Sequence, residues 1–441
     1  MSQTTERTVG LPNARLGAAV QTGAGRPVAT LLSPVVQSGR VDVSDIAHLS
    51  GPELRDVLLG RARALVPLLE RNAAATEAGR RVVEENIKAI REAGLFKIMV
   101  PRRYGGLETD IRTKLEVSRE LARGCGSTSW ATTLMNVCAW FAGLASAEAQ
   151  DDVWGRNPKA RVAGVFAPTA KSRRVDGGLI VTGKWPWASG CLHADWALLG
   201  VPVVDADGQE TDQGLALIPM PELTIEDTWF VAGMKGTGSN TVVAEEVFIP
   251  DHRIVSVPKL LAGDPPTPYK DEALYRSSFI PVAVLVLAGP QLGLCARALE
   301  FVIEKAPKRG ISYTFYETQT ASPSFQLALA EAATLVDGAH LFAYRAADDI
   351  DGAARAGRKL SYLERARVRM DTGHAVKTAR NAIDTLISAH GAASFADSSP
   401  MQRIWRDSET ASRHAVISPA VSAEVYGRAL LGITEGVTAL V

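Results

Sequence analysis

Residues 233–253 read GMKGTGSNTVVAEEVFIPDHR, and this segment carries the clearest evidence about the architecture. The β-branched run 241–249 predicts a strand that ends at Pro250, because proline cannot continue a central strand. The glycine-rich segment before it, Gly236-Thr237-Gly238, lies between two β-rich runs and does not open a helix after a strand. It therefore indicates a turn and not a dinucleotide-binding loop.

Similar short β-rich runs precede this strand in the middle of the chain. They cover residues 161–166, 172–185, 196–204, 214–219 and 224–231. Within the second run, Asp176-Gly177-Gly178 is typical of a hairpin turn. Six runs at this spacing predict a small antiparallel β-barrel or sandwich.

Helical patterns flank the β-rich segment on both sides. They cover 54–69, 74–93, 112–123 and 130–144 before it, and 277–305, 324–352, 358–390 and 419–432 after it. Ser50-Gly51-Pro52-Glu53 resembles a capping box at the start of the first helix. The chain is therefore expected to divide into a flexible N-terminal arm and three domains. The predicted bounds are 1–49 for the arm, 50–158 for an N-terminal helical domain, 159–262 for a middle β-barrel domain and 263–441 for a C-terminal four-helix bundle.

The composition argues against several classes of protein. Lys and Arg number 48 and Asp and Glu number 48, so no basic excess points to nucleic acid or to a membrane surface. The four cysteines are scattered and the seven histidines lack metal-ligand spacing, so we expect no metal site. No secretory signal peptide is visible, and the apolar run 280–296 is short for a membrane span, which favours a buried core helix. These features are typical of a cytoplasmic protein.

Four motifs lie along the chain in an order that can be compared with a known family. They are Gly126-Ser127-Thr128-Ser129-Trp130, the stretch WPWASGCLHA at 185–194, the segment 233–253, and QRIWRD at 402–407 with His414 beyond it. Over about residues 55–432, this helical–β–helical order with these motifs resembles the α+β multidomain fold of the acyl-CoA dehydrogenase superfamily. The details are most similar to its reduced-flavin-dependent, two-component (group D) monooxygenase branch, which includes 4-hydroxyphenylacetate hydroxylase oxygenase components.

The resemblance implies a flavin site formed by residues from several segments. Two tryptophans beside Ser-Gly supply a flat apolar wall, a hydroxyl and a close backbone approach. Ser189 would lie near flavin N5 and C4a, and Arg309 would bind the flavin phosphate of a neighbouring subunit. The implied flavin-binding residues are Trp130, Ala167, Pro168, Trp187, Ser189, Gly190 and Arg309. Structural roles remain open for Trp130 and Arg309, and a β-bulge with core aromatics remains the alternative for the stretch 185–194. We interpret His193 as structural.

The catalytic candidates implied by the resemblance are His414 and Ser189. In acyl-CoA dehydrogenases a catalytic glutamate follows the Arg-Asp pair within Glu-Gly-Thr, and this chain has His414 near that place instead. A dehydrogenase needs a carboxylate to take the proton alpha to a thioester, whereas a histidine that titrates near neutral pH suits a hydroxylase. Cys138 stands where several members carry a histidine, and with Phe141 and His414 it would line the substrate pocket. A solvated histidine at a helix end is the alternative for His414.

The sequence therefore predicts the oxygenase component of a two-component flavin-dependent monooxygenase. It would hydroxylate a small aromatic or polycyclic substrate through a flavin C4a-hydroperoxide, using O2 and reduced FMN or FAD, with FMN favoured. A separate NAD(P)H-dependent flavin reductase would supply the reduced flavin, and the chain would form a homotetramer arranged as a dimer of dimers. The alternatives are an acyl-CoA dehydrogenase or oxidase, an N- or S-oxygenase of the same fold, and a non-catalytic relative.

Overall fold

A computed structural model describes residues 43–441. Residues 1–42, which make up most of the predicted N-terminal arm, lie outside the described residues. The described part begins with helices, as the sequence predicts, although the pattern 74–93 divides into two of them. These helices are α1 (Gly51–Arg71), α2 (Ala73–Ala78), α3 (Glu84–Glu92), α4 (Ile111–Gly124), α5 (Gly126–Gly143) and α6 (Ala147–Trp154).

The capping box expected at the start of α1 does not form. Ser50 occupies the N-cap position, but its side chain makes no capping hydrogen bond, so that detail of the prediction is wrong. A complete capping box occurs in the C-terminal part of the chain, where Ser361 and Glu364 bond each other's backbone N–H groups.

The middle of the chain forms two open four-stranded sheets. The first has the order β1-β4-β5-β8 and the second the order β2-β3-β7-β6. Their strands are β1 (Val162–Val165), β2 (Ala170–Val175), β3 (Gly178–Trp185), β4 (Trp196–Val204), β5 (Glu210–Pro219), β6 (Thr224–Glu226), β7 (Thr241–Pro250) and β8 (Ile254–Ser256). Several boundaries agree with the sequence, including those of β4 and the hairpin turn between Val175 and Gly178.

The predicted antiparallel β-barrel is wrong, because neither sheet closes on itself. The β2–β3 hairpin belongs to the second sheet and separates β1 from β4 in the chain. The chain therefore crosses over between them, and β1 pairs with β4 in parallel. Alternation of side chains reveals a strand, but it does not reveal which strand will be its partner.

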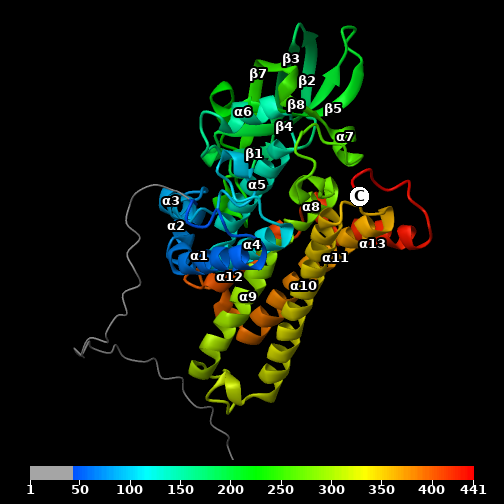
Figure 1. The fold of residues 1–441 in the computed structure, drawn as a ribbon. Helices are drawn as coiled ribbons and strands as arrows, with labels where there is room; N and C mark the ends of the chain where they lie inside the picture. The colour runs from blue at the N-terminus through cyan, green and yellow to red at the C-terminus, as the bar shows by residue number, and fades with distance from the viewer. Residues whose placement is uncertain (1–42) are drawn as a thin grey trace, which may run out of the picture. The chain divides into compact units, whose positions relative to one another are not determined.

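The C-terminal part is helical, and Figure 1 shows its long helices α9, α10 and α11 side by side. All four expected helical segments are present, with 277–305 divided into α8 and α9, and α7 and α12 are additional. The helices are α7 (Val257–Leu261), α8 (Phe279–Leu285), α9 (Ala288–Lys305), α10 (Pro323–Arg355), α11 (Tyr362–His390), α12 (Pro400–Ala411) and α13 (Pro419–Leu430).

One helical stretch of the described residues, 279–308, is long and apolar enough by composition to cross a membrane. Within this fold, however, 89% of its most apolar window is buried. That burial supports the interpretation of the apolar run 280–296 as a core helix.

Helix α5 lies where the β-domain meets the helical parts (Figure 1). It contacts β1 and the short turn Lys235–Thr237 on the side of the sheets, and α4 and α9 on the side of the helices. Residues on α5 can therefore contact side chains from all three parts of the fold, and a site formed by several segments is expected around this helix.

Candidate active site

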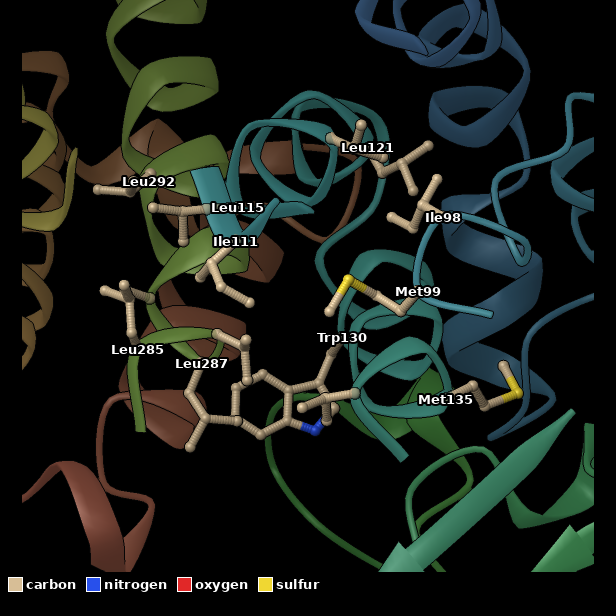
Figure 2. Close-up of a cluster of buried hydrophobic side chains, with 14 of the residues drawn as sticks. Ile98, Met99, Ile111, Leu115, Leu121, Trp130, Met135, Leu285, Leu287 and Leu292 are labelled. Carbon is tan, nitrogen blue, oxygen red and sulfur yellow. The ribbon is translucent and has the colours of Figure 1, made fainter. Parts of the chain in front are cut away.

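Trp130 lies near the N-terminal end of α5 and is buried. Figure 2 shows its indole among apolar side chains from α4, α5 and the region of α8 and α9. The labelled neighbours in this cluster include Ile111, Leu115, Met135, Leu285, Leu287 and Leu292. An indole in such surroundings still needs a partner for its single polar atom, Nε1.

A chain of hydroxyl groups provides that partner. The Trp130 Nε1–H donates to Ser189 Oγ at 3.1 Å, and Ser189 Oγ lies 2.7 Å from Ser239 Oγ. Ser239 Oγ lies 2.6 Å from Thr237 Oγ1, which donates to the carbonyl oxygen of Met234 at 2.9 Å. The structure thus connects the first, second and third sequence motifs through buried side chains.

The loop between β3 and the β4 strand presents an aromatic surface to solvent. Trp187 has a φ of 70° and is 66% exposed, and its ring meets Trp229 edge-on at 5.3 Å. A bulky residue in the left-handed region is strained, and such strain clusters at functional sites. Gly190 follows with a φ of 79°, and a Cβ there would lie 3.2 Å from Met135 Cγ.

Helix α12 holds the loop that carries Thr237 and Ser239. The Asp407 carboxylate accepts a hydrogen bond from the Met234 backbone N–H at 2.5 Å, and burial raises the pKa of this carboxyl to about 6. At Gly233 a Cβ would lie 1.9 Å from the Arg406 carbonyl oxygen, so only glycine permits this approach. The C-terminal helices therefore fix the backbone on which the hydroxyl chain depends.

His414 follows α12 and reaches the same region. Its ring centroid lies 6.0 Å from that of Trp130. The residue is exposed, yet the protein atoms around the ring desolvate it and lower the pKa of the imidazole. A lowered pKa leaves this ring neutral at neutral pH, and so able to accept a proton. The structure thus brings Trp130, Ser189 and His414 together.

The remaining candidates for flavin binding lie in two different places. Ala167 and Pro168 are exposed directly after β1, where the Ala167 carbonyl accepts from Thr169 N. Arg309 lies between α9 and α10, and its Nη1 is 2.6 Å from Nε2 of His390. The structure of one chain does not bring Arg309 to Ser189 or Trp187, and Figure 1 shows the α9–α10 connection at the end of the long helices away from the sheets.

The predicted pocket residues Cys138 and Phe141 lie further along α5 and are buried. Phe141 packs edge-on against Phe166 at 4.6 Å between ring centroids, and in a tilted arrangement against Phe279 at 4.9 Å. The three rings form an aromatic cluster. Burial raises the pKa of the Cys138 thiol to about 12, so the thiol is neutral. The Cys138 thiol therefore cannot exchange a proton near pH 7 as a histidine at that position could.

Lys114 on α4 is a polar group that nothing in the sequence singles out. It is completely buried, its Nζ has no hydrogen-bond partner, and burial lowers its pKa well below the usual range. The only ionisable group of the described residues that acts on this pKa is the Cys138 thiol. Burial therefore disfavours the charged form of this amine, which lies near the substrate-pocket candidates.

Sequence reasoning also missed Thr237, Ser239 and Asp407. The first two lie within the segment 233–253, which we interpreted as a structural turn, and the turn Lys235–Thr237 does form there. A run of small hydroxyl residues beside glycines was the available signal. His193 is buried, and its backbone N–H donates to the Gly190 carbonyl oxygen.

The arrangement fits a flat, redox-active aromatic group better than a metal ion. Among residues 43–441, no cluster of His, Cys, Asp or Glu has the grouping that a metal needs. The exposed Trp187 offers a ring-sized apolar face, and Ser189 offers a hydroxyl beside it. An isoalloxazine ring, which has two apolar faces and a polar edge, matches both features.

Comparisons with known proteins identify the family of this chain. Two family models match, "Acyl-CoA dehydrogenase, N-terminal domain" over residues 62–155 and "Acyl-CoA dehydrogenase, C-terminal domain" over 285–419. The chain is 34% identical to the flavin-dependent monooxygenase oxygenase subunit HsaA of Rhodococcus jostii, over 85% of this chain and 98% of the relative. It is 31% identical to the oxygenase component of p-hydroxyphenylacetate 3-hydroxylase of Acinetobacter baumannii, over 88% and 92%.

A solved structure of similar sequence also matches the fold. XiaF from a Streptomyces species, in complex with FADH2 and glycerol, superposes with a TM-score of 0.82 at 38% identity. The match covers 86% of this chain and 96% of XiaF.

Proposed function

The chain belongs to the acyl-CoA dehydrogenase family and within it to the flavin-dependent monooxygenases, and from this premise we propose that it hydroxylates a small aromatic or polycyclic substrate with reduced flavin and O2. The observation that carries the proposal is the meeting of Trp130, Ser189 and His414 beside the exposed Trp187. A histidine in this position supports oxygen transfer, whereas proton removal from an acyl-CoA calls for a carboxylate.

Residues of the β-domain would hold the flavin. Trp187 would supply an apolar face for the isoalloxazine ring, Ser189 a hydroxyl at its polar edge, and Gly190 the close backbone approach. The exposed backbone at Ala167 and Pro168 would meet the flavin from the end of β1, and Arg309 would reach the flavin phosphate of a neighbouring subunit. The flavin, when bound in its reduced form, supplies the two electrons with which O2 is activated.

The protein's own tasks are to exclude water, to orient the substrate and to manage one proton. The apolar cluster around Trp130 keeps bulk water away from one side of the site (Figure 2). The aromatic cluster of Phe141, Phe166 and Phe279 offers flat surfaces that favour an aromatic substrate. The neutral His414 would accept the proton that the substrate loses as it gains oxygen.

The identity of the flavin is a separate part of the proposal. Sequence reasoning favours FMN, whereas the likeness to XiaF, solved with FADH2, supports FAD. Dissociation constants of both reduced flavins, measured side by side without oxygen, decide between them.

The proposal includes a separate NAD(P)H-dependent flavin reductase as partner and a cytoplasmic location. The relationship to oxygenase subunits and components supports the partner. The test is a reaction with a generic flavin reductase, NADH and a panel of phenols, indoles and polycyclic aromatics. The proposed function predicts a product that is heavier by one oxygen atom.

An acyl-CoA dehydrogenase is the second candidate, favoured only by the family models. Such an enzyme would hold oxidised flavin tightly when purified and would bleach when an acyl-CoA is added. The proposed monooxygenase would purify largely colourless and would take up reduced flavin.

Replacing Ser189 with alanine is expected to weaken reduced-flavin binding by no more than a few-fold. The loss of one neutral hydrogen bond is worth about 0.5–1.5 kcal/mol, so release of H2O2 should accelerate by roughly a few-fold to tenfold. Stopped-flow traces of reduced flavin mixed with O2, with H2O2 assayed in parallel, measure both effects. Unchanged H2O2 release would mean that Ser189 only shapes the loop.

We expect a homotetramer arranged as a dimer of dimers. Large apolar side chains lie exposed on the C-terminal helices and on the loop between α9 and α10 close to Arg309; they are Tyr313, Phe315, Leu327 and Leu341. Contact with further copies would cover them. Light scattering at micromolar concentration should give four times the mass of the chain. Tyr313→Ser combined with Phe315→Ser should lower the measured mass. A wild-type monomer would contradict the arrangement.

A further inference from the structure

The hydroxyl chain that includes Ser189 ends in a group that can only donate a hydrogen bond and in a group that can only accept one. At one end stands the Trp130 Nε1–H, which can only donate a hydrogen bond. At the other end stands the Met234 carbonyl oxygen, which can only accept the bond from Thr237 Oγ1. Between them lie three hydroxyl groups, and each has a single hydrogen to donate.

These fixed ends determine the direction of every bond between them. Thr237 has given its hydrogen to Met234 O, so the 2.6 Å contact with Ser239 requires Ser239 to donate. Ser239 has then used its hydrogen, so the 2.7 Å contact with Ser189 requires Ser189 to donate. Ser189 already accepts from Trp130, and its remaining capacity is therefore one acceptor lone pair.

All members of the hydroxyl chain are buried, which maintains the direction of its hydrogen bonds. Ser189, Thr237 and Ser239 are each at most 6% exposed. A buried hydroxyl that turned its hydrogen away from its neighbour would leave a contact without a hydrogen, which is costly away from water.

We propose that Thr237 and Ser239 make this site selective for the redox state of the flavin, by leaving Ser189 able only to accept a hydrogen bond. The inference rests on the proposed function, in which Ser189 lies at the polar edge of the flavin. In reduced flavin N5 carries a hydrogen and donates, whereas in oxidised flavin N5 has a lone pair and needs a donor. Because Ser189 can only accept, its oxygen accepts the hydrogen bond from N5–H of reduced flavin. Toward oxidised flavin, the same oxygen places its lone pair against the lone pair of N5, which is unfavourable. Thr237 and Ser239 are therefore positioning residues.

Thr237→Val tests the direction of the chain directly. Valine keeps the shape, and the Met234 carbonyl retains the bond from Trp229 Nε1 at 3.0 Å. Ser239 then has no acceptor at position 237 and is free to donate to Ser189, which releases the Ser189 hydrogen for oxidised N5. Ser239→Ala removes the group that accepts the Ser189 hydrogen, and so frees that hydrogen directly. Both variants should bind oxidised flavin more tightly relative to reduced flavin.

The measurement is the pair of dissociation constants for oxidised and reduced flavin, taken anaerobically for the reduced form. Wild type is expected to prefer reduced flavin by at least roughly tenfold. Each variant should narrow that ratio by roughly fivefold, which corresponds to about 1 kcal/mol and to a fall of about 20 mV in the midpoint potential of the bound two-electron couple. A purely structural loss would weaken both forms equally and leave the ratio unchanged.

Thr372→Val is the matched control. Thr372 is also buried and also donates to a backbone carbonyl, Val368 O at 2.8 Å, but within α11. Its substitution should leave the ratio unchanged. If the wild type prefers reduced flavin and both site variants keep that ratio within twofold, the proposed selection is overturned while the flavin site stands. If the wild type binds neither form, the proposed function itself fails and the selection with it.

Discussion

Replacing His414 with alanine is expected to lower aromatic product formation by roughly 100-fold or more while O2 consumption continues. General acid–base help of this kind is worth about 10²–10⁴-fold, and His414 is the titratable side chain beside Trp130 whose pKa is lowered by desolvation. Without it, electrons from reduced flavin should reach O2 and leave as H2O2. Product formed per O2 consumed is the quantity to measure, together with the dissociation constant of reduced flavin, which should stay near that of the wild type.

His414→Asn separates hydrogen bonding from proton transfer, since asparagine can do the first and not the second. It should suppress H2O2 release more than it restores product. The pKa of His414 lies below its ordinary value of 6.5, so the neutral, proton-accepting form persists at neutral pH. Product yield should therefore be flat near pH 7 and fall only as the pH drops through that lowered pKa. Full coupling in His414→Ala would show that the histidine is structural.

Replacing Trp187 with alanine should weaken flavin binding by roughly 10- to 100-fold. The indole is 66% exposed and forms the apolar wall proposed for the flavin ring. Covering about 100 Å² of that surface stabilises the complex by about 2.5 kcal/mol. Titration of flavin fluorescence with the variant, for FMN and for FAD, measures the loss.

Trp187→Phe keeps an aromatic face and should retain most of the affinity. Phe248→Ala removes another exposed aromatic ring of the β-domain, 46% exposed on β7, and should not change flavin binding. Equal flavin affinity in wild type and Trp187→Ala would place the flavin elsewhere and remove the main support for the site.

The sequence predicted the elements of the fold well where local patterns are strong. The β-branched run 196–204 matches β4, and the two-residue turn at Asp176-Gly177 matches the β2–β3 hairpin. The pairing of the strands was not predictable in the same way. The crossover that makes β1 and β4 parallel depends on where the intervening hairpin packs, and that is decided by tertiary contacts.

The candidate site shows the same division. Family motifs identified Trp130, Ser189 and His414, and the structure brings them together. The hydroxyl chain was missed because its members come from segments about fifty residues apart, and spacing along the sequence gives no sign of a hydrogen bond across that distance. Ser239 was hidden for this reason within a turn that is also structural.

Helix α12 and Lys114 were missed for different reasons. Helix α12 carries many polar residues, and what fixes it is Asp407 bonded to Met234 N, a contact between distant segments. Lysine is seldom fully buried, so a lysine on an amphipathic helix is expected to face solvent. Lys114 departs from that rule beside the candidate substrate pocket.

The fate of isotope-labelled O2 tests the proposed monooxygenase activity most directly. The chain, a flavin reductase, NADH and the aromatic panel are incubated under labelled O2, and products are analysed by mass spectrometry. The proposed function predicts an aromatic product that carries one labelled oxygen atom and that disappears when either the reductase or this chain is omitted. Recovery of the whole aromatic panel without labelled oxygen, while an acyl-CoA supplied in a parallel incubation is oxidised to its unsaturated form, would contradict it.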